Sequence, residues 1–396
     1  MKKIVYILQV GILLAFFYLY FSKKISYLKN IEGNDKCEIF TFLPIESNVK
    51  IIGRYYQFNN VTWIVQSGSA IEFYVTGKSA NVNIIGDSNI EREEIFRPRY
   101  AIYLDDKLFL DLILNELEVN IKLFEEEKEK TVKIKIMLLS EAIYGGVGIK
   151  NINLNSCNSK VESPIKPINK KDLLIEFIGD SITCGYGVEA HNESENFTTS
   201  TENFSKSYAY LTSQQLNADY IIVAYSGYGI IFGDTPEEED EFALIPKIYT
   251  KTSKNEEYPG EWDFNKRKVD IIVINLGTND SGYIKEDPEK RNDEFIQEYA
   301  NFIKLVREKH PNAYILCTIG TLGVNFVYPL IEEAAKLVGD NKVSCFESPQ
   351  QDSEDGLGAN YHPSVKTHEK LSKLVSEKIS NIYFIYINNI KCDFIG

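Results

Sequence analysis

With 396 residues, 44% of them hydrophobic and 12% aromatic, the chain can bury a large core, which excludes a disordered protein and favours two domains. Its 57 acidic residues outnumber the 43 basic ones, for a formal charge of −14, and no Lys- or Arg-rich stretch is interleaved with aromatic residues. Because nucleic acids are bound mainly through basic surfaces, we expect no nucleic-acid partner.

The first predicted element is an apolar segment at the N-terminus. Two lysines precede eighteen largely apolar residues (4–21), and two more lysines follow them. About 20 apolar residues span a bilayer as a helix, and no small-residue cleavage site follows the segment. We therefore expect residues 1–30 to be an uncleaved signal anchor, with a cleaved signal peptide as the second choice and a buried core helix as the third. Either of the first two predicts a secreted or cell-surface protein, anchored by this transmembrane segment if it is not cleaved.

Residues 37–158 are predicted to form a β domain. Short segments rich in β-branched and aromatic residues follow one another with Gly, Asn or Asp between them, and no segment of helical period intervenes. Many strands at short spacing predict an antiparallel sandwich of the jelly-roll type. The expected strands are 61–65, 70–75, 80–85, 99–104 and 131–137.

Residues 159–171, which are polar and contain two prolines, are predicted to be a linker, and residues 172–381 an α/β domain. In this second domain continuous apolar runs alternate with amphipathic segments of helical length, which is typical of a parallel sheet with helices on both faces. Residues 382–396 are expected to be a tail. The expected strands are 173–178, 220–224, 269–276 and 314–319, and the expected helices are 207–216, 292–309, 326–338 and 364–379.

The six cysteines lie far apart, without CxxC pairs and without a nearby His. This spacing argues against a zinc site, and we expect no metal. Cys317 and Cys345 stand inside apolar runs, where a thiol packs as a small hydrophobic group. We therefore expect mostly free, buried thiols rather than a disulfide framework.

Ser181 is the candidate nucleophile. It follows the first predicted strand of the second domain, after Gly179 and Asp180, at the start of a helix. The first N–H groups of a helix lack partners and the helix dipole favours an oxyanion there. Taken alone, the same Asp-Ser pattern is equally typical of an ordinary helix N-cap.

Two further strand ends carry donors that suit an oxyanion. Gly227 follows the second predicted strand and offers a backbone N–H, and Asn279 follows the third and offers a side-chain amide. Each motif taken singly is more typical of a plain β–α turn.

His362 is the candidate general base among four histidines. It lies in the Gly-rich segment 355–364, directly before a proline that suits the first turn of a helix. His191 lies in a polar loop, His310 ends a charged helix, and His368 falls in a polar part of the last predicted helix. Four strand-end loops in chain order, each with one suitable group, favour a Ser–His hydrolase over four unrelated turns.

These blocks resemble the SGNH (GDSL-type) hydrolases, which have Ser, Gly, Asn and His in this chain order. More closely, the chain resembles carbohydrate esterase family two, the acetyl xylan esterase-like enzymes with an N-terminal β-sandwich and an SGNH domain. The resemblance covers about residues 50–380. It is carried by segments 179–187, 262–264 and 355–364 and, in the β domain, by Gly53-Arg54 with Trp63.

The resemblance implies a flavodoxin-like parallel sheet and a carbohydrate O-acetyl esterase. It implies that Ser181 is the nucleophile and His362 its base. The backbone N–H groups of Ser181 and Gly227 would form the oxyanion hole together with the Asn279 side chain. It also implies an acetylated carbohydrate, such as a plant polysaccharide, as the substrate, and no metal or organic cofactor. We expect a monomer.

One position departs from the SGNH pattern. Most SGNH enzymes carry an Asp three residues before the catalytic His, where this chain has Ala359. Family two members are often dyads in which a backbone carbonyl orients the His, so this resemblance accommodates Ala359. It also implies substrate contacts from Tyr361, by stacking on a sugar ring, and from Asn360 and Asp180. Asp355, seven residues upstream of the His, is not assigned to the site.

Two other functions stay open at this point. One is a sugar-binding protein on a catalytically inactive SGNH scaffold, which the complete set of four motif residues argues against. The other is a lipase or thioesterase of the same fold, which the absence of a large apolar lid segment beside the motifs argues against.

Overall fold

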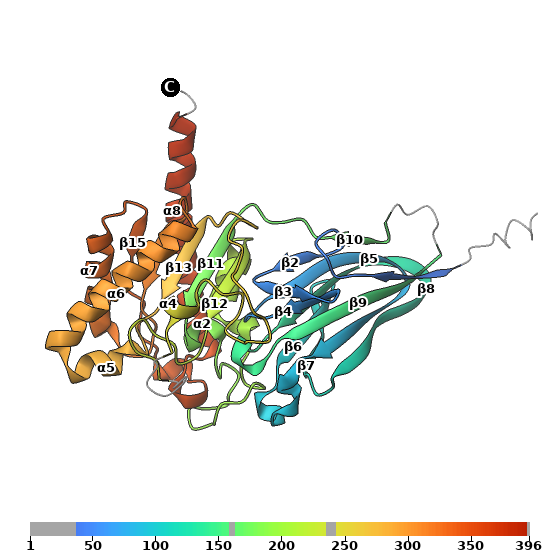
Figure 1. Cartoon of the computed structure of the whole chain (residues 1–396), viewed down its shortest axis with the longest axis horizontal. Coiled ribbons are helices and arrows are strands. Elements are labelled where there is room, and N and C mark those ends of the chain that lie inside the picture. The colour runs from blue at the N-terminus through green and yellow to red at the C-terminus, as the bar shows by residue number, and fades with distance from the viewer. Residues whose placement is uncertain (1–36, 158–162, 235–242, 394–396) are drawn as a thin grey trace, which may run out of the picture.

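In a computed structural model, residues 37–157, 163–234 and 243–393 form two β-sheets of different kinds (Figure 1). The N-terminal part contains an antiparallel sheet of ten strands, and the C-terminal part contains a five-stranded parallel sheet with helices around it. The predicted signal anchor, residues 1–30, lies outside the described residues. Within the described parts of the chain, none of the helices is both long and apolar enough to cross a membrane.

The antiparallel sheet is built around long strands rather than the short ones that we expected. The predicted strands 70–75 and 80–85 are one strand, β5 (Ala70–Gly86), because no turn separates them and the chain passes through a bulge between Gly77 and Ser79 instead. The first half of β5 lies beside β2 and β10, and the second half lies beside β9. The strands are β1 Glu38–Phe42, β2 Lys50–Ile52, β3 Tyr55–Phe58, β4 Val61–Ile64, β5, β6 Arg99–Leu104, β7 Lys107–Ile113, β8 Glu118–Leu138, β9 Val147–Ser156 and β10 Ile165–Pro167.

Two features of this domain contradict the sequence-based expectations. Strand β10 lies within the segment that we expected to be a linker, where it pairs with β5. A disulfide joins Cys37 to Cys157, because the antiparallel pairing of Glu38 with Ser156 places the two flanking cysteines opposite each other. The expectation of free thiols is wrong for this pair and correct for Cys184, Cys317 and Cys345.

The parallel sheet has the strand order β12-β11-β13-β14-β15. This is the flavodoxin-like order, in which the chain begins inside the sheet, moves to one edge and then crosses to the other. All four predicted strands are present, and β15 adds an edge that we did not predict. The strands are β11 Leu174–Gly179, β12 Asp219–Ala224, β13 Ile271–Asn275, β14 Tyr314–Thr318 and β15 Val343–Cys345.

Helices cover both faces of this sheet, as predicted. Apolar side chains of α3 and α8 pack on one face, and those of α6 and α7 pack on the other. Helix α8 continues through the segment that we expected to be a separate tail and projects from the domain (Figure 1). The helices are α2 Ser181–Cys184, α3 Tyr208–Gln215, α4 Ile245–Ile248, α5 Asp280–Glu286, α6 Pro288–Lys309, α7 Tyr328–Val338 and α8 Val365–Asp393. Short 3-10 helices are η1 Ser88–Glu91, η2 Glu94–Phe96, η3 Ala142–Tyr144, η4 Phe204–Lys206, η5 Asn325–Val327, η6 Ser353–Asp355 and η7 Ala359–Tyr361.

The two domains are joined by the buried side chain of Arg54, from the turn between β2 and β3. Its guanidinium donates to the backbone carbonyls of Tyr249 and Lys251, at 2.5 and 2.6 Å, and pairs with the Glu176 carboxylate of β11 at 3.2 Å. Both members of the ion pair are fully buried. A charge in such a place needs several partners, and Arg54 finds them only in the second domain.

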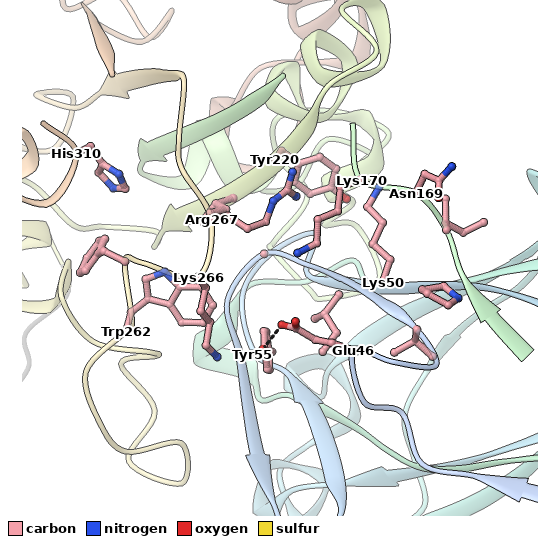
Figure 2. Close-up of a pocket in the computed structure, with 17 residues that line it drawn as sticks. Glu46, Lys50, Tyr55, Asn169, Lys170, Tyr220, Trp262, Lys266, Arg267 and His310 are labelled. Atoms are coloured by element: carbon pink, nitrogen blue, oxygen red, sulfur yellow. Dashed lines mark hydrogen bonds between the residues drawn. The ribbon is translucent and has the colours of Figure 1, made fainter. Parts of the chain in front are cut away.

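A cavity of about 230 Å³ lies at the same junction (Figure 2). Trp262 lines it beside Lys266, whose amine is 4.9 Å from the centre of the indole ring. Tyr220, close to the start of β12, and His310, just ahead of β14, also line it. The cavity is therefore at the amino ends of the parallel strands, whereas the motif residues follow the carboxyl ends.

Candidate active site

Ser181 lies at a sharp turn between β11 and α2. A Cβ on Gly179 would lie 2.0 Å from the Thr183 hydroxyl, so the turn requires glycine. The Asp180 carboxylate caps α2 by accepting the N–H of Ile182 at 3.0 Å. Ser181 itself is therefore the first helical residue, and its own N–H points out of the helix end with no acceptor inside the helix.

The structure brings His362 to Ser181 from a distant part of the chain. The imidazole Nε2 is 2.8 Å from the Ser181 Oγ, which is hydrogen-bonding distance. His362 directly follows η7 and precedes α8, in a loop that lies 181 residues further along the chain than Ser181.

Backbone carbonyls orient the imidazole. The Nδ1 atom of His362 lies 3.2 Å from the carbonyl oxygens of both Ala359 and Asn360. Carbonyls only accept, so Nδ1 carries the proton and Nε2 presents its lone pair to the Ser181 hydroxyl. Desolvation lowers the pKa of His362 to about 4, so the ring is neutral and able to act as a base at pH 7.

No carboxylate takes the place of the missing triad Asp among the described residues around His362. Ala359 is fully buried and packs against Gly187, whose backbone oxygen accepts the Ala359 N–H at 3.0 Å. The Asp355 carboxylate forms an ion pair with Lys370 instead. The geometry is that of a Ser–His dyad held by two carbonyls.

The two other motif loops approach each other beside this dyad. Gly227 follows β12 with a φ of 80°, which glycine adopts without strain. Asn279 precedes α5, and its side-chain amide donates to the Tyr228 carbonyl at 2.8 Å. An amide has two hydrogens, so one remains for an oxyanion.

A residue that sequence analysis missed ties these two loops together. The buried Asp280 carboxylate accepts the N–H groups of Ile230, Ile231 and Phe232, at distances between 2.7 and 3.1 Å. Asp280 directly follows Asn279, so the Gly227 loop and the Asn279 loop are held at a fixed separation. Asp280 ends a Gly-Thr-Asn-Asp motif, which could have marked it as a site residue, but the sequence did not indicate what role it has.

The three expected substrate contacts differ in position. Tyr361 is 63% exposed and directly precedes His362, and the exposed Asn360 donates to the Tyr186 hydroxyl at 3.1 Å. Asp180 is fully buried, because its side chain caps α2. Tyr361 and Asn360 can thus reach a substrate, whereas Asp180 lies beneath the nucleophile and cannot.

Aromatic rings behind the imidazole were also missed. The Tyr186 ring lies 4.2 Å from the His362 ring, and Phe197 stacks on Tyr186 at 4.1 Å. Tyr144 of the β domain continues this row, at 5.3 Å from Phe197. These contacts hold the imidazole in place, but they join segments too distant in sequence to be paired from the sequence alone.

Among the described residues, one group could offer three ligands to a metal ion. One donor atom from each of Glu141, Cys184 and Glu202 lies within 4.8 Å of the others, and all three residues are buried. The dyad and the oxyanion donors do not include any of the three.

Comparisons with known proteins find similar chains among the esterases. Residues 177–370 match the model of the GDSL-like Lipase/Acylhydrolase family. The chain is 32% identical to the cellulase/esterase CelE of Acetivibrio thermocellus over 352 residues, which are 85% of this chain and 40% of CelE. It is 30% identical over 217 residues to an acetylxylan esterase / glucomannan deacetylase of Cellvibrio japonicus, covering 52% of this chain and 58% of that protein.

A solved structure is similar over nearly all of its length. It is that of a family two carbohydrate esterase from Clostridium thermocellum in complex with cellohexaose, with a TM-score of 0.73 and 28% identity. The match covers 85% of this chain and 99% of that one. By contrast, the chain spans less than half of the length of CelE.

Proposed function

Because the chain carries a GDSL-type lipase/acylhydrolase domain of the SGNH fold and has family two carbohydrate esterases among its relatives, we propose that it is a carbohydrate O-acetyl esterase. The observation that carries this proposal is the 2.8 Å approach of the His362 Nε2 lone pair to the Ser181 hydroxyl. Ser181 and His362, which sequence analysis took from two separate loops, meet there.

In the first half of the reaction, the Ser181 Oγ attacks the acetyl carbonyl carbon while His362 Nε2 accepts the hydroxyl proton. The negative charge moves to the carbonyl oxygen, where the N–H groups of Ser181 and Gly227 and the Asn279 amide donate to it. When the bond between the acyl carbon and the sugar oxygen breaks, the imidazolium gives its proton to that oxygen. The sugar leaves with a free hydroxyl, and the acetyl group stays on Ser181.

Water completes the cycle with the same groups. His362 takes a proton from water, the hydroxide adds to the acetyl carbon, and the same donors hold the second oxyanion. Collapse releases acetic acid and returns the proton to the Ser181 oxygen. In both halves of the reaction, the Nδ1–H group of His362 donates a hydrogen bond to the carbonyls of Ala359 and Asn360. These hydrogen bonds stabilise the transient imidazolium without a carboxylate.

An acetylated polysaccharide is the substrate class that the relatives support. One relative is named as an acetylxylan esterase and glucomannan deacetylase, and a similar structure holds cellohexaose. The exposed ring of Tyr361, beside the dyad, offers an aromatic face to a sugar ring.

We further propose that the chain acts outside the cytoplasm, held at the membrane by residues 1–30 unless that segment is cleaved. The Cys37–Cys157 disulfide supports this location, because disulfides persist mainly in oxidising compartments.

The test is acetate release by the full-length chain from acetylated xylan and glucomannan, beside long-chain esters. We expect release from the glycans, almost none from Ser181→Ala, and normal release from Ser47→Ala, which alters an exposed serine of the β domain. A preference for long-chain esters would identify a lipase. Sugar binding without acetate release, and without labelling of Ser181 by a fluorophosphonate, would identify a non-catalytic binding protein.

A further inference from the structure

Two fully buried glutamates lie directly behind the turn that carries Gly227. Glu141 comes from the loop after β8 in the β domain, and Glu202 comes from the segment before η4 in the second domain. Neither carboxyl forms an ion pair among the described residues. Buried carboxylates without a cation are costly, so the pair calls for an explanation.

The contacts of the pair point toward the active site. Glu141 Oε2 accepts the N–H of Ser226, the residue before Gly227, at 2.7 Å. Glu202 Oε2 accepts the backbone N–H of Glu141 at 3.0 Å. The second oxygen of each carboxyl has no hydrogen-bond partner among the described residues. An atom of each carboxyl lies within 4.8 Å of the other and of the Cys184 sulfur.

We propose that Glu141, through Ser226, is a positioning residue for the oxyanion donor Gly227, and that Glu202 holds Glu141 in place by accepting its backbone N–H. This inference rests on the proposed esterase function, because it gives the Gly227 N–H its role.

Burial outweighs the effect of the cations around the pair. Arg99 donates to the Glu202 backbone carbonyl at 3.0 Å, but its ion pairs are with Asp111 and Glu189. Burial is the main effect on both carboxyls. It raises the pKa of Glu141 to about 7, and it acts with the Glu141 charge to raise the pKa of Glu202.

Other ionisable groups face the pair from the elements packed on it. Cys184 of α2 and the tyrosines Tyr144 and Tyr186 add no positive charge. Lys254 lowers the pKa of Glu141, but less than burial raises it. Because the Ser226 N–H donates to Glu141, movement of Glu141 would displace Ser226.

Three variants separate positioning from mere packing. Glu141→Gln keeps an acceptor for Ser226 and cannot ionise, so we expect kcat within about threefold of wild type near pH 6.5. Glu202→Gln keeps an acceptor for the Glu141 N–H, so we expect a kcat close to that of wild type. Glu141→Ala removes the acceptor, and we expect kcat to fall roughly 10- to 100-fold with KM little changed, because a small misplacement of a donor costs rate rather than binding.

The decisive measurement is the pair of constants kcat and KM for acetate release by the full-length chain and its variants. Wild type and both Gln variants should have a similar kcat, and Glu141→Ala should lose kcat without a matching change in KM. A KM that rises as much as kcat falls in Glu141→Ala would overturn the positioning role. Should Glu141→Ala fail to fold, Glu141→Asp, whose shorter side chain withdraws the acceptor from Ser226, takes its place.

Three other outcomes have distinct meanings. Equal kcat for Glu141→Ala and Glu141→Gln would overturn the positioning role. One tightly bound metal ion per chain, with activity lost on chelation and restored by the metal, would identify the pair as part of a metal site and overturn the inference. A wild-type chain that releases no acetate from any glycan would instead count against the proposed function and leave the three variants without a reference.

Discussion

At the scale of single residues, the proposed reaction depends on how His362 is held. Two carbonyl acceptors at 3.2 Å do the work that a carboxylate does in most triads, because they fix the same tautomer and ring orientation. A carbonyl carries only a partial charge, so it raises the basicity of the imidazole less than a carboxylate does. Desolvation therefore dominates, and the pKa of His362 falls to about 4.

This pKa predicts where activity is lost in acid. The base must be neutral to accept the Ser181 proton, and a lowered pKa keeps it neutral further into the acid range. We expect kcat/KM for acetate release to stay near its plateau down to about pH 5 and to fall as pH drops through about 4. Loss of activity with a midpoint near the ordinary His value of about 6.5 would contradict the described environment of the ring.

Asn279 provides a second prediction at this scale. Its amide keeps one hydrogen for the oxyanion after donating to Tyr228. Removal of one oxyanion donor costs about 10²–10³ in kcat, so Asn279→Ala should be slow but measurable, with KM little changed. Asn265→Ala, on an exposed loop before β13, serves as the control and should match wild type. An unaffected kcat in Asn279→Ala would remove Asn279 from the oxyanion hole.

At the scale of elements, the most informative contact is that between Arg54 and β11. The side chain is fully buried and bonds only to groups of the second domain. Its partner Glu176 also lies 3.0 Å from His310, so a core network extends from the domain junction to the end of α6. Loss of the guanidinium would leave a buried carboxylate without its cation.

Arg54→Ala should therefore destabilise the protein by about 3–5 kcal/mol, measured by urea unfolding. The matched control is Lys122→Ala, which breaks an exposed ion pair with Glu125 and should barely move the unfolding midpoint. If Arg54→Ala unfolds at the same urea concentration as the control, the junction does not depend on this pair.

Elements that are local in sequence could be predicted, and those that depend on distant partners could not. The strands 173–178, 220–224, 269–276 and 314–319 were found because each is a buried run bounded by turns. The sequence-based prediction divided β5 into two strands, because a glycine at a bulge, such as Gly77, looks like a glycine at a turn in the sequence. Strand β10 was missed because a three-residue strand with a proline resembles a linker.

The same distinction applies to the candidate site. Ser181, Gly227, Asn279 and His362 each occupy a recognisable motif after a strand or before a helix, so their types and order were informative. Glu141 could not be found in this way, because it lies in another domain and reaches Ser226 only through the packing of the two sheets. The pairing of Cys37 with Cys157 was missed for a similar reason, since it follows from the register of β1 on β9.

At the scale of the whole molecule, the Cys37–Cys157 disulfide closes almost the entire β domain into one loop. The two cysteines are 120 residues apart in sequence. A crosslink over so long a loop restricts the unfolded chain strongly, which is the main way in which disulfides stabilise.

Replacement of both cysteines by alanine should lower the free energy of unfolding by about 2–4 kcal/mol. A reductant should destabilise wild type and leave the double variant unchanged. Cys345→Ala, which removes a free thiol, should keep its sensitivity to the reductant. A wild-type unfolding curve that does not respond to complete reduction of the disulfide would contradict this role.

The most direct test of the account is the identity of the acyl-enzyme. The full-length chain is mixed with an acetylated xylo-oligosaccharide, quenched in acid during turnover, digested and analysed by mass spectrometry. We expect an acetyl group on the peptide that contains Ser181, located on Ser181 itself, and none in Ser181→Ala. Acetate release with the acetyl group on another residue, or undiminished release by Ser181→Ala, would contradict it.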